Sequence, residues 1–262
     1  MQLTGRTAVL TGASGGIGAA MAQALAQAGV HLLLVGRRAA ALQTLATRLG
    51  GSHLPLVADL ATADGRAVVQ QACAALPQGV DILINNAGIG AFGAFEAQPP
   101  DQIEALISGN LLAPMLLTQA LLPALRRAPR GLIVNVGSAF GGLGYPGFTA
   151  YAASKFGLRG FSEALRRELA DSAVGVLYLA PRATATAINS ERVVALNAAL
   201  GNATDAPQVV ARALLRQLRD ERPYRAIGGP QRVFARLNAL LPGLVDRAIR
   251  RQLPVIRRFL SP

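Results

Sequence analysis

The chain has 262 residues, of which 52% are hydrophobic and 15% charged, and its formal net charge at pH 7 is +12. This length predicts a large buried core in a single domain spanning residues 1–262. The chain has one cysteine, Cys73, which excludes an intrachain disulfide and is expected to be a small buried apolar residue. The two histidines have no second ligand at metal-binding spacing, so we expect no metal site.

Short apolar runs alternate with helix-like stretches along the chain. Strands are predicted at Thr7–Leu10, Val30–Val35, Leu54–Ala58, Val80–Ile84, Leu132–Val136 and Val174–Leu179, with a weaker one at Tyr224–Ile227. Helices are predicted at Ile17–Ala28, Ala39–Leu49, Thr62–Leu76, Asp101–Arg127 and Thr149–Ala170. The strand runs are continuously apolar, as expected of strands buried on both faces. This order predicts an α/β fold, a doubly wound parallel sheet of about seven strands with helices on both faces.

A glycine-rich turn joins the first strand to the first helix, in VLTGASGGIGAAMAQALAQAG. Gly12, Gly16 and Gly18 have the spacing G-x-x-x-G-x-G, with Ser14 and Ile17 between them. Glycine permits a tight turn and close approach of the backbone to a pyrophosphate, which the free N–H groups at the helix start would bind. The motif predicts a dinucleotide site; the alternative is that these glycines serve only strand–helix packing.

The second strand ends in the sequence LLLVGRRAA. Gly36 occupies the place where a carboxylate would bind the ribose 2′-hydroxyl of NAD(H). Arg37 and Arg38 follow, and an arginine pair suits a 2′-phosphate through its charge and bidentate geometry. Together with the Ser14 hydroxyl, they predict NADP(H) rather than NAD(H). The alternative is that both arginines are the solvated start of a helix.

An apolar run between Glu104 and Arg126 is long enough to span a membrane on length alone. It contains Ser, Asn, Thr and Gln as well as Pro114, so we expect a helix that is buried on most sides in a soluble fold.

Residues 151–155 read YAASK and contain the only lysine of the chain, against 25 arginines. Tyr151 and Lys155 are four residues apart, which places them on one face of a helix. A phenol with a pKa of about 10 is a poor acid or base at neutral pH, and a nearby ammonium lowers that pKa. Ser138 would add a hydrogen bond to a developing oxyanion. These residues predict proton transfer to a carbonyl that receives hydride; the alternative for Tyr151 and Lys155 is an ordinary surface pair.

The loop after Ser138, AFGGLGYPGF, is rich in glycine and aromatic residues. An apolar substrate pocket is predicted from the side chains of Phe92, Phe95, Phe140, Leu143, Tyr145 and Phe148. The alternative is that these rings pack the loop or a subunit contact.

The segment from Pro223 to Pro262 carries eight arginines, interleaved with apolar residues, against the single acid Asp246. It is expected to be either a helical cover over the substrate end of the sheet or a basic amphipathic surface for anionic lipid or a partner chain. Despite the positive charge of the whole chain, Trp is absent, aromatic residues are 5%, and no known nucleic-acid-binding motif occurs, so we expect no nucleic-acid partner.

These motifs together resemble the short-chain dehydrogenase/reductase family. The match runs in order from about Gly5 to Thr186 and includes TGASGGIG, ADL, NNAG, Asn110, Ser138, YAASK and a segment that begins at Pro181. The resemblance implies a Rossmann-like fold, a homodimer or homotetramer formed through helices Asn110–Arg127 and Thr149–Ala170, and a cytoplasmic enzyme. We also find no secretory signal at the start of the sequence.

The resemblance also implies a role for each matching residue. Asn110 would hold a water in a proton relay, Ser138 would bind the substrate carbonyl oxygen, Tyr151 would be the general acid or base, and Lys155 would bind the nicotinamide ribose. Further cofactor contacts are implied for Asp59 and Leu60 at the adenine, for Asn85, Ala87 and Gly88 beside the ribose and central strand, and for Pro181, Thr184 and Thr186 near the nicotinamide and phosphates.

Two positions depart from the family pattern. Arg182 follows Pro181 where the family usually has glycine, and its side chain is expected either to reach into the substrate pocket or to point to solvent. Gly109 stands where the family more often has a branched residue, which is expected to loosen the start of that helix.

The sequence therefore predicts an NADP(H)-dependent oxidoreductase that acts on an apolar carbonyl compound or secondary alcohol. The competing hypothesis is a non-catalytic NADP(H)-binding sensor or scaffold with the same fold. A peripheral membrane contact through the basic C-terminal segment is compatible with either.

Overall fold

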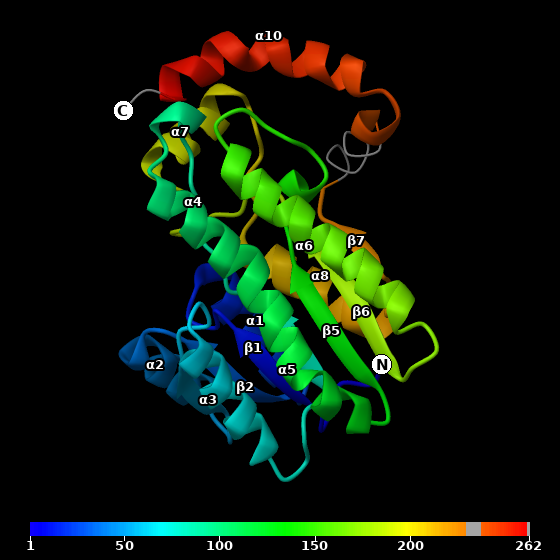
Figure 1. Cartoon of the computed structure of the whole chain (residues 1–262). Coiled ribbons are helices and arrows are strands. Elements are labelled where there is room, and N and C mark those ends of the chain that lie inside the picture. Colours follow the sequence, from blue (N-terminus) through cyan, green and yellow to red (C-terminus); the bar gives the residue numbers. More distant parts are fainter. Residues whose placement is uncertain (229–236, 261–262) are drawn as a thin grey trace.

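A computed structural model of the chain describes residues 1–228 and 237–260. Within these residues, seven strands form one parallel sheet in the order β3-β2-β1-β4-β5-β6-β7 (Figure 1). The strands are β1 (Thr7–Thr11), β2 (His31–Gly36), β3 (Leu54–Val57), β4 (Ile82–Asn85), β5 (Gly131–Val136), β6 (Val174–Ala180) and β7 (Tyr224–Ala226). The predicted doubly wound, Rossmann-like sheet is confirmed, and the strand order reverses between β1 and β4, where such folds bind ligands.

Helices cover both faces of this sheet. The described α-helices are α1 (Gly16–Gln27), α2 (Ala39–Leu49), α3 (Ala63–Ala74), α4 (Pro100–Ile107), α5 (Ala113–Arg127), α6 (Thr149–Glu168), α7 (Glu191–Ala199), α8 (Pro207–Asp220) and α10 (Pro242–Leu260). Short turns of 3-10 helix lie at η1 (Phe95–Ala97) and η3 (Ala139–Gly141), and a π-helical turn, η2 (Ser108–Leu112), separates α4 from α5. The helix predicted without a break over Asp101–Arg127 is therefore interrupted at Gly109.

The core is built from alternate residues of each strand. Val9 and Ile133, with their equivalents on neighbouring strands, pack against α3, α5 and α6. Leu10 and Val134 face the other way, against α1, α2 and α8. Each fully buried Leu or Ile contributes about 1.5–3 kcal/mol to stability, so this double-sided burial holds the sheet rigid beneath its loops. Cys73 is buried among the first group, and burial raises the pKa of its thiol to about 12, as expected of a structural residue.

The residues Pro100–Arg127 form, among the described parts of the chain, the one helix that is long and apolar enough to cross a membrane by length and composition alone. Of its most apolar window, 39% is buried, less than the sequence suggested. The inner side packs on α3 and the sheet, whereas Leu112 and Met115 on the outer side are 46% and 37% exposed. This helix therefore covers the sheet and presents an apolar outer face.

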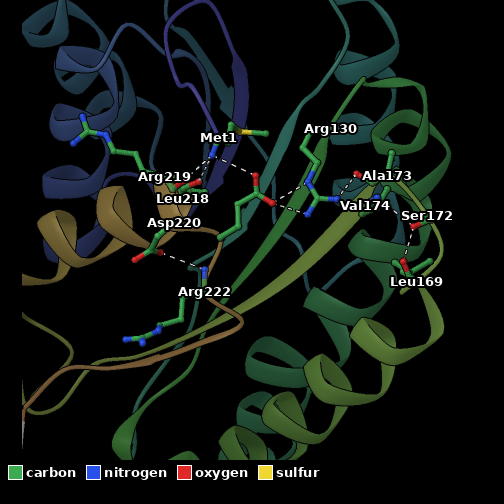
Figure 2. Close-up of polar contacts among 11 residues, drawn as sticks. Met1, Arg130, Leu169, Ser172, Ala173, Val174, Leu218, Arg219, Asp220 and Arg222 are labelled. Atoms are coloured by element: carbon green, nitrogen blue, oxygen red, sulfur yellow. Dashed lines mark hydrogen bonds and ion pairs between the residues drawn. The ribbon is translucent and has the colours of Figure 1, made fainter.

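At the end of the sheet opposite the predicted site, three segments meet at Glu221 (Figure 2). The Met1 ammonium donates hydrogen bonds to the carbonyls of Leu218 and Arg219 at 3.2 and 2.8 Å and lies 3.3 Å from the Glu221 carboxylate. Arg130 binds the same carboxylate at 2.5 Å. Glu221 has a φ of 50°, a left-handed conformation that is uncommon for residues with a side chain, and these contacts hold it there.

Candidate active site

The glycine-rich turn crosses the carboxyl end of β1. Gly12 has a φ of 62°, and a Cβ atom there would lie 2.8 Å from the Ala87 Cα. A Cβ atom at Gly18 would lie 2.1 Å from the Gly12 carbonyl oxygen, and one at Gly16 would lie 2.6 Å from a Thr186 methyl group. These close contacts show that the glycines are needed for strand–helix packing. Packing does not by itself explain why the start of α1 is left open.

The start of α1 also fits an anion. Its N-cap residue, Gly15, has no side chain to accept a hydrogen bond, and no acidic residue lies in the first turn. The N–H groups of Gly16, Ile17 and Gly18 thus point from a helix start without a side-chain cap, which is the arrangement that binds phosphates. These residues fit the pyrophosphate of a dinucleotide.

Two residues that sequence reasoning missed hold this turn in place. The Thr11 hydroxyl accepts hydrogen bonds from the backbone N–H groups of Asn86 and Ala87, both at 2.9 Å. The Asn86 amide donates to the carbonyls of Thr11 and Gly12 at 3.0 and 3.3 Å. The NNAG segment is therefore fastened to the turn. Its second asparagine could have been singled out only by knowing that β1 and β4 are neighbours.

The predicted 2′-phosphate residues cluster beside the turn. Arg37 and Arg38 are exposed after β2, and the Arg38 guanidinium donates to the Ser14 carbonyl at 3.2 Å. A Cβ atom at Gly36 would lie 3.5 Å from the Ser14 hydroxyl oxygen. Two guanidinium groups and a hydroxyl therefore surround the place where the adenosine ribose of a dinucleotide would lie.

The remaining predicted cofactor residues after β3 and β4 divide into two groups. Asp59 is exposed, and its carboxylate accepts from the Ala61 N–H at 3.1 Å. Leu60 beside it is partly buried against the core. Asn85, in contrast, is buried, and its amide donates to Thr118 at 3.0 Å and to Asn135 at 2.9 Å. The Asn85 side chain thus joins β4 to α5 and β5 inside the core.

Asn110 lies in the π-helical turn and is fully buried. Its side chain binds the backbone N–H and carbonyl of Ile89 at 2.8 and 2.9 Å and donates to the Ser154 hydroxyl at 3.1 Å. A Cβ atom at Gly88 would lie 2.9 Å from the Asn110 side-chain oxygen, so only glycine fits there. Asn110 thereby fixes the segment after NNAG against the helix that carries Tyr151 and Lys155.

Ser138, Tyr151 and Lys155 are brought together by the end of β5 and the start of α6. The Ser138 side chain begins the η3 turn by accepting from the Phe140 N–H at 3.1 Å, and it also hydrogen-bonds the Tyr151 hydroxyl. The Lys155 ammonium donates to the Val136 carbonyl at 3.2 Å and lies 5.8 Å from the centre of the Tyr151 ring. The structure therefore unites the three residues that the sequence selected.

Burial controls the titration of this group. Burial raises the pKa of Tyr151, and the hydrogen bond from Ser138 opposes part of that shift. Burial also lowers the pKa of Lys155 to about 8, because the ammonium is removed from water and has no carboxylate beside it. The sequence predicted that Lys155 lowers the pKa of Tyr151. In the chain by itself, burial raises that pKa, and the opposing effect comes from Ser138.

Tyr178 in β6 was not predicted as a site residue. It is 3% exposed, its hydroxyl donates to the Lys155 carbonyl at 3.3 Å, and it accepts from the Ser138 N–H at 3.4 Å. A Cβ atom at Gly137 or Gly141 would lie 1.9 or 2.1 Å from this hydroxyl oxygen. Tyr178 therefore links the loop of Ser138 to the helix of Lys155 and occupies the space that two glycines leave open.

Arg182 takes neither of the two orientations expected from the sequence. Its guanidinium forms a bidentate ion pair with Asp205 at 2.8 and 2.6 Å, and this hydrogen bond raises the pKa of Arg182. The buried Thr184, whose hydroxyl donates to the Arg182 carbonyl at 2.9 Å, pairs with Asp205 through the backbone. The segment from Pro181 is thus fixed, and it brings Thr186 over Gly16 at the start of α1.

Most of the predicted aromatic residues form one cluster around Tyr151. The Phe140 and Phe148 rings lie 6.4 and 6.2 Å from the Tyr151 ring, and the Phe92 ring lies 4.9 Å from that of Phe148. Tyr145 stacks on Phe140 at 5.5 Å. Phe95 is 56% exposed in η1 and is absent from the contacts between described rings.

Helix α10 lies across the end of the molecule beside α7 (Figure 1). Gln252 accepts a hydrogen bond from the Tyr145 hydroxyl at 2.7 Å, and Arg192 of α7 donates to the Phe259 carbonyl. A Cβ atom at Gly147 would lie 2.7 Å from a Leu260 methyl group. The C-terminal helix therefore packs over the loop that precedes Tyr151.

The fold places a nucleotide-binding turn and a serine–tyrosine–lysine group at the same edge of a parallel sheet, an arrangement that defines a nicotinamide-dependent oxidoreductase. Residues 6–196 match the family model described as short chain dehydrogenase. The chain belongs to this short-chain dehydrogenase/reductase family, as the motifs indicated.

Individual relatives agree with this assignment. Nodulation protein G of Rhizobium sp. (strain N33) is 41% identical over 180 residues, which cover 69% of this chain and 74% of that protein. A short-chain dehydrogenase from Sphingobium yanoikuyae in complex with NADPH is 30% identical with a TM-score of 0.77, covering 92% of this chain and 95% of that one. A family member from Burkholderia phymatum in complex with NAD has a TM-score of 0.84 at 23% identity, covering 93% and 96%, and shows the shared fold.

Proposed function

We propose that the protein uses NADPH to reduce the carbonyl group of an apolar substrate, with Tyr151 as the general acid. The observation that carries this proposal is the position of Tyr151, which is hydrogen-bonded by Ser138 and enclosed by aromatic rings, with Lys155 close by. Family membership supports an oxidoreductase but leaves the substrate open.

A bound nicotinamide supplies the hydride. Ser138 hydrogen-bonds the substrate oxygen as negative charge develops there, and Tyr151 donates its proton to that oxygen. The Lys155 ammonium then stabilises the phenolate that remains. Because burial raises the pKa of Tyr151, its phenol is protonated at neutral pH, and the protonated form is the one that a reduction needs.

The preference for NADPH rests on the charges beside the glycine-rich turn. Arg37, Arg38 and Ser14 offer two guanidinium groups and a hydroxyl, and no carboxylate stands at Gly36 to repel a phosphate. The structural relative in complex with NADPH supports this choice, whereas the one in complex with NAD shows that the fold accepts either cofactor.

The experiment compares NADPH with NADH on a panel of apolar aldehydes and ketones, following nicotinamide absorbance. We expect turnover with NADPH and its loss in Tyr151→Phe, and we expect Arg37→Ala/Arg38→Ala to raise KM for NADPH without raising KM for NADH. Turnover that survives in Tyr151→Phe would refute the mechanism. NADPH binding without turnover of any substrate would instead support the non-catalytic sensor or scaffold.

We also propose that the protein is a homodimer or homotetramer. Leu112, Met115 and Phe156 are large apolar residues that are 46%, 37% and 41% exposed on the helices expected to form the subunit contact. Burying such a face stabilises an oligomer. Light scattering on the full chain tests this proposal.

A peripheral membrane contact is proposed for the C-terminal segment. Leu240, Leu241 and Leu244 are 77%, 55% and 56% exposed beside the start of α10, and the exposed arginines of α10 are Arg247, Arg250, Arg251, Arg257 and Arg258. Exposed leucines next to arginines suit a surface of anionic lipid. A substrate dissolved in lipid would then reach the protein at α10, close to the loop that precedes Tyr151.

A further inference from the structure

A cavity of about 750 Å³ lies at the edge of the sheet between α6, α8 and β7. Its described lining contains the arginines Arg159, Arg212, Arg216, Arg222 and Arg225. Tyr224 also lines it and stacks on Tyr178 at 5.7 Å, so these two rings separate the cavity from Ser138. We call this feature the arginine cavity, and its size is typical of small-molecule sites.

Most of this positive charge is not neutralised by the described residues. Arg159 pairs with Glu163 at 3.0 Å, and Arg225 pairs with Asp220. The described ion pairs include no carboxylate partner for Arg212, Arg216 or Arg222. The backbone N–H of Arg222 donates to the Asp220 carboxylate at 3.3 Å. Figure 2 shows that the Arg222 side chain extends away from Arg130.

The helix α8 carries two of these arginines at an unfavourable spacing. Arg212 and Arg216 are four residues apart, so both guanidinium groups lie on one face of the helix, where like charges repel. Arg159 and Arg225 reach the same space from α6 and β7. Arg212, Arg216 and Arg222 are exposed, so solvent screens part of the repulsion among these charges, and an anion bound among them would lower it further.

One donor in the cavity is also buried without a described partner. The Nε atom of Arg225 is inaccessible to solvent and makes no hydrogen bond among the described residues, although its side chain is 18% exposed overall. A buried N–H group without an acceptor is costly, and a ligand oxygen could satisfy it once the Arg225 side chain turned toward the cavity.

We propose that the arginine cavity binds a small molecule with two or more phosphate groups. Guanidinium groups bind phosphate through paired hydrogen bonds, and the three without a described carboxylate partner can hold several phosphate oxygens at once. The walls contain Val209, Ala213, Ala226 and Ile227, so an attached organic group would find apolar contacts. The inference is independent of the proposed reaction, because no catalytic residue lines this cavity.

The test measures binding of tripolyphosphate and of inorganic phosphate to the full chain by titration calorimetry at two salt concentrations. We expect one tripolyphosphate per chain at the arginine cavity, in addition to any that the glycine-rich turn binds, and we expect it to bind at least about tenfold more tightly than phosphate and more weakly at high salt. Arg212→Gln/Arg216→Gln should lower the affinity at least about tenfold, because it removes two charged donors.

Two matched double variants show where the anion binds. Arg126→Gln/Arg127→Gln removes the same charge from the exposed end of α5, and Arg37→Gln/Arg38→Gln removes it beside the glycine-rich turn. Both should keep the affinity within about twofold. Equal losses in all three variants, or a loss only in Arg37→Gln/Arg38→Gln, would overturn the proposal. So would a change of oligomeric state in Arg212→Gln/Arg216→Gln with no anion binding, which would identify the surface as a subunit contact.

Discussion

The surroundings of Lys155 favour lysine over arginine, although both residues carry the same charge. Its side chain is 5% exposed, it donates to the Val136 carbonyl, and it lies 3.5 Å from the place where a Cβ atom of Gly88 would be. A compact ammonium fits this space, whereas a planar guanidinium needs more room. In a chain with 25 arginines, this restriction explains why position 155 is lysine.

We expect Lys155→Arg to retain the fold and lower kcat at least about 100-fold, because acid–base catalysis of this kind contributes about 10²–10⁴. Steady-state kinetics with NADPH measures the loss, and circular dichroism checks that the fold is retained. Near-normal turnover in this variant would make the lone lysine an accident of composition.

The titration of Lys155 predicts a pH dependence of the same reaction. Because burial lowers its pKa to about 8, the ammonium loses its proton as the pH rises through that value, and kcat/KM for reduction should fall. The pKa of Tyr151 is raised, so its phenol remains protonated over this range. A kcat/KM that stays constant to about pH 10 would contradict the assignment.

Tyr178 is a positioning residue in the proposed reaction. Replacing it with Phe leaves the Ser138 N–H and the Lys155 carbonyl without their shared partner, and small displacements of reacting groups are costly. We expect Tyr178→Phe to lower kcat about tenfold while KM for NADPH stays unchanged. Tyr224→Phe is the matched control, since it removes the hydroxyl of the ring stacked on Tyr178 and should keep kcat.

The charge of Glu221 stabilises the C-terminal end of helix α8. Burial alone would raise the pKa of its carboxyl, but hydrogen bonds from Arg130 and the Met1 ammonium outweigh that effect and lower it. A lowered pKa means that the folded state favours the carboxylate. The resulting stability is present above the pKa of the unfolded chain and is lost as the pH falls through the lower folded value.

We therefore expect Glu221→Gln to lower the free energy of unfolding by about 0.5–1 kcal/mol at pH 7, the range for partly exposed ion pairs. The difference between the two proteins should begin to shrink as the pH falls below the ordinary carboxyl pKa of about 4.3, and it should vanish only below the lower pKa that Glu221 has in the folded state. Urea unfolding at several pH values measures it. A difference that persists at acid pH would assign the effect to packing.

The elements differ in how far the sequence could predict them. The apolar runs identified all seven strands within one or two residues. The five inner strands are buried on both faces, which gives a local signature, whereas the edge strands β3 and β7 are partly exposed. The π-helical turn was not predicted, since it depends on contacts of Asn110 with Ile89 and Ser154, which are 21 and 44 residues away. Helices α7 and α8 follow the last recognisable motif and were left unassigned.

The residues of the candidate site that belong to a sequence motif could be predicted. Ser138, Tyr151 and Lys155 were found by their spacing, and the structure brings them together. Tyr178 and Asn86 were missed because their importance arises from strands that become neighbours only in the fold. The pairing of Arg182 with Asp205 likewise joins residues 23 positions apart, which no local pattern shows.

For the whole molecule, the C-terminal leucines predict lipid binding. We expect the full chain to sediment with vesicles of phosphatidylserine and phosphatidylcholine, and less with phosphatidylcholine alone, because anionic lipid attracts the arginines of α10. Leu240→Ser/Leu241→Ser/Leu244→Ser should weaken this binding, since it removes about 1.5–3 kcal/mol of apolar transfer for each leucine that is fully buried in lipid. Equal sedimentation of the variant and the parent protein would exclude these leucines as the contact.

The position of α10 also has a consequence for the order in which the molecule is completed during synthesis. Tyr145 meets Gln252 and Arg192 meets Phe259, so the helix that packs over the loop before Tyr151 comes from the part of the chain that leaves the ribosome late. The glycine-rich turn and its supporting strands emerge much earlier, but a domain generally folds as a unit. The loop before Tyr151 can therefore be covered only after α10 has been synthesised, and until then it lies open to water.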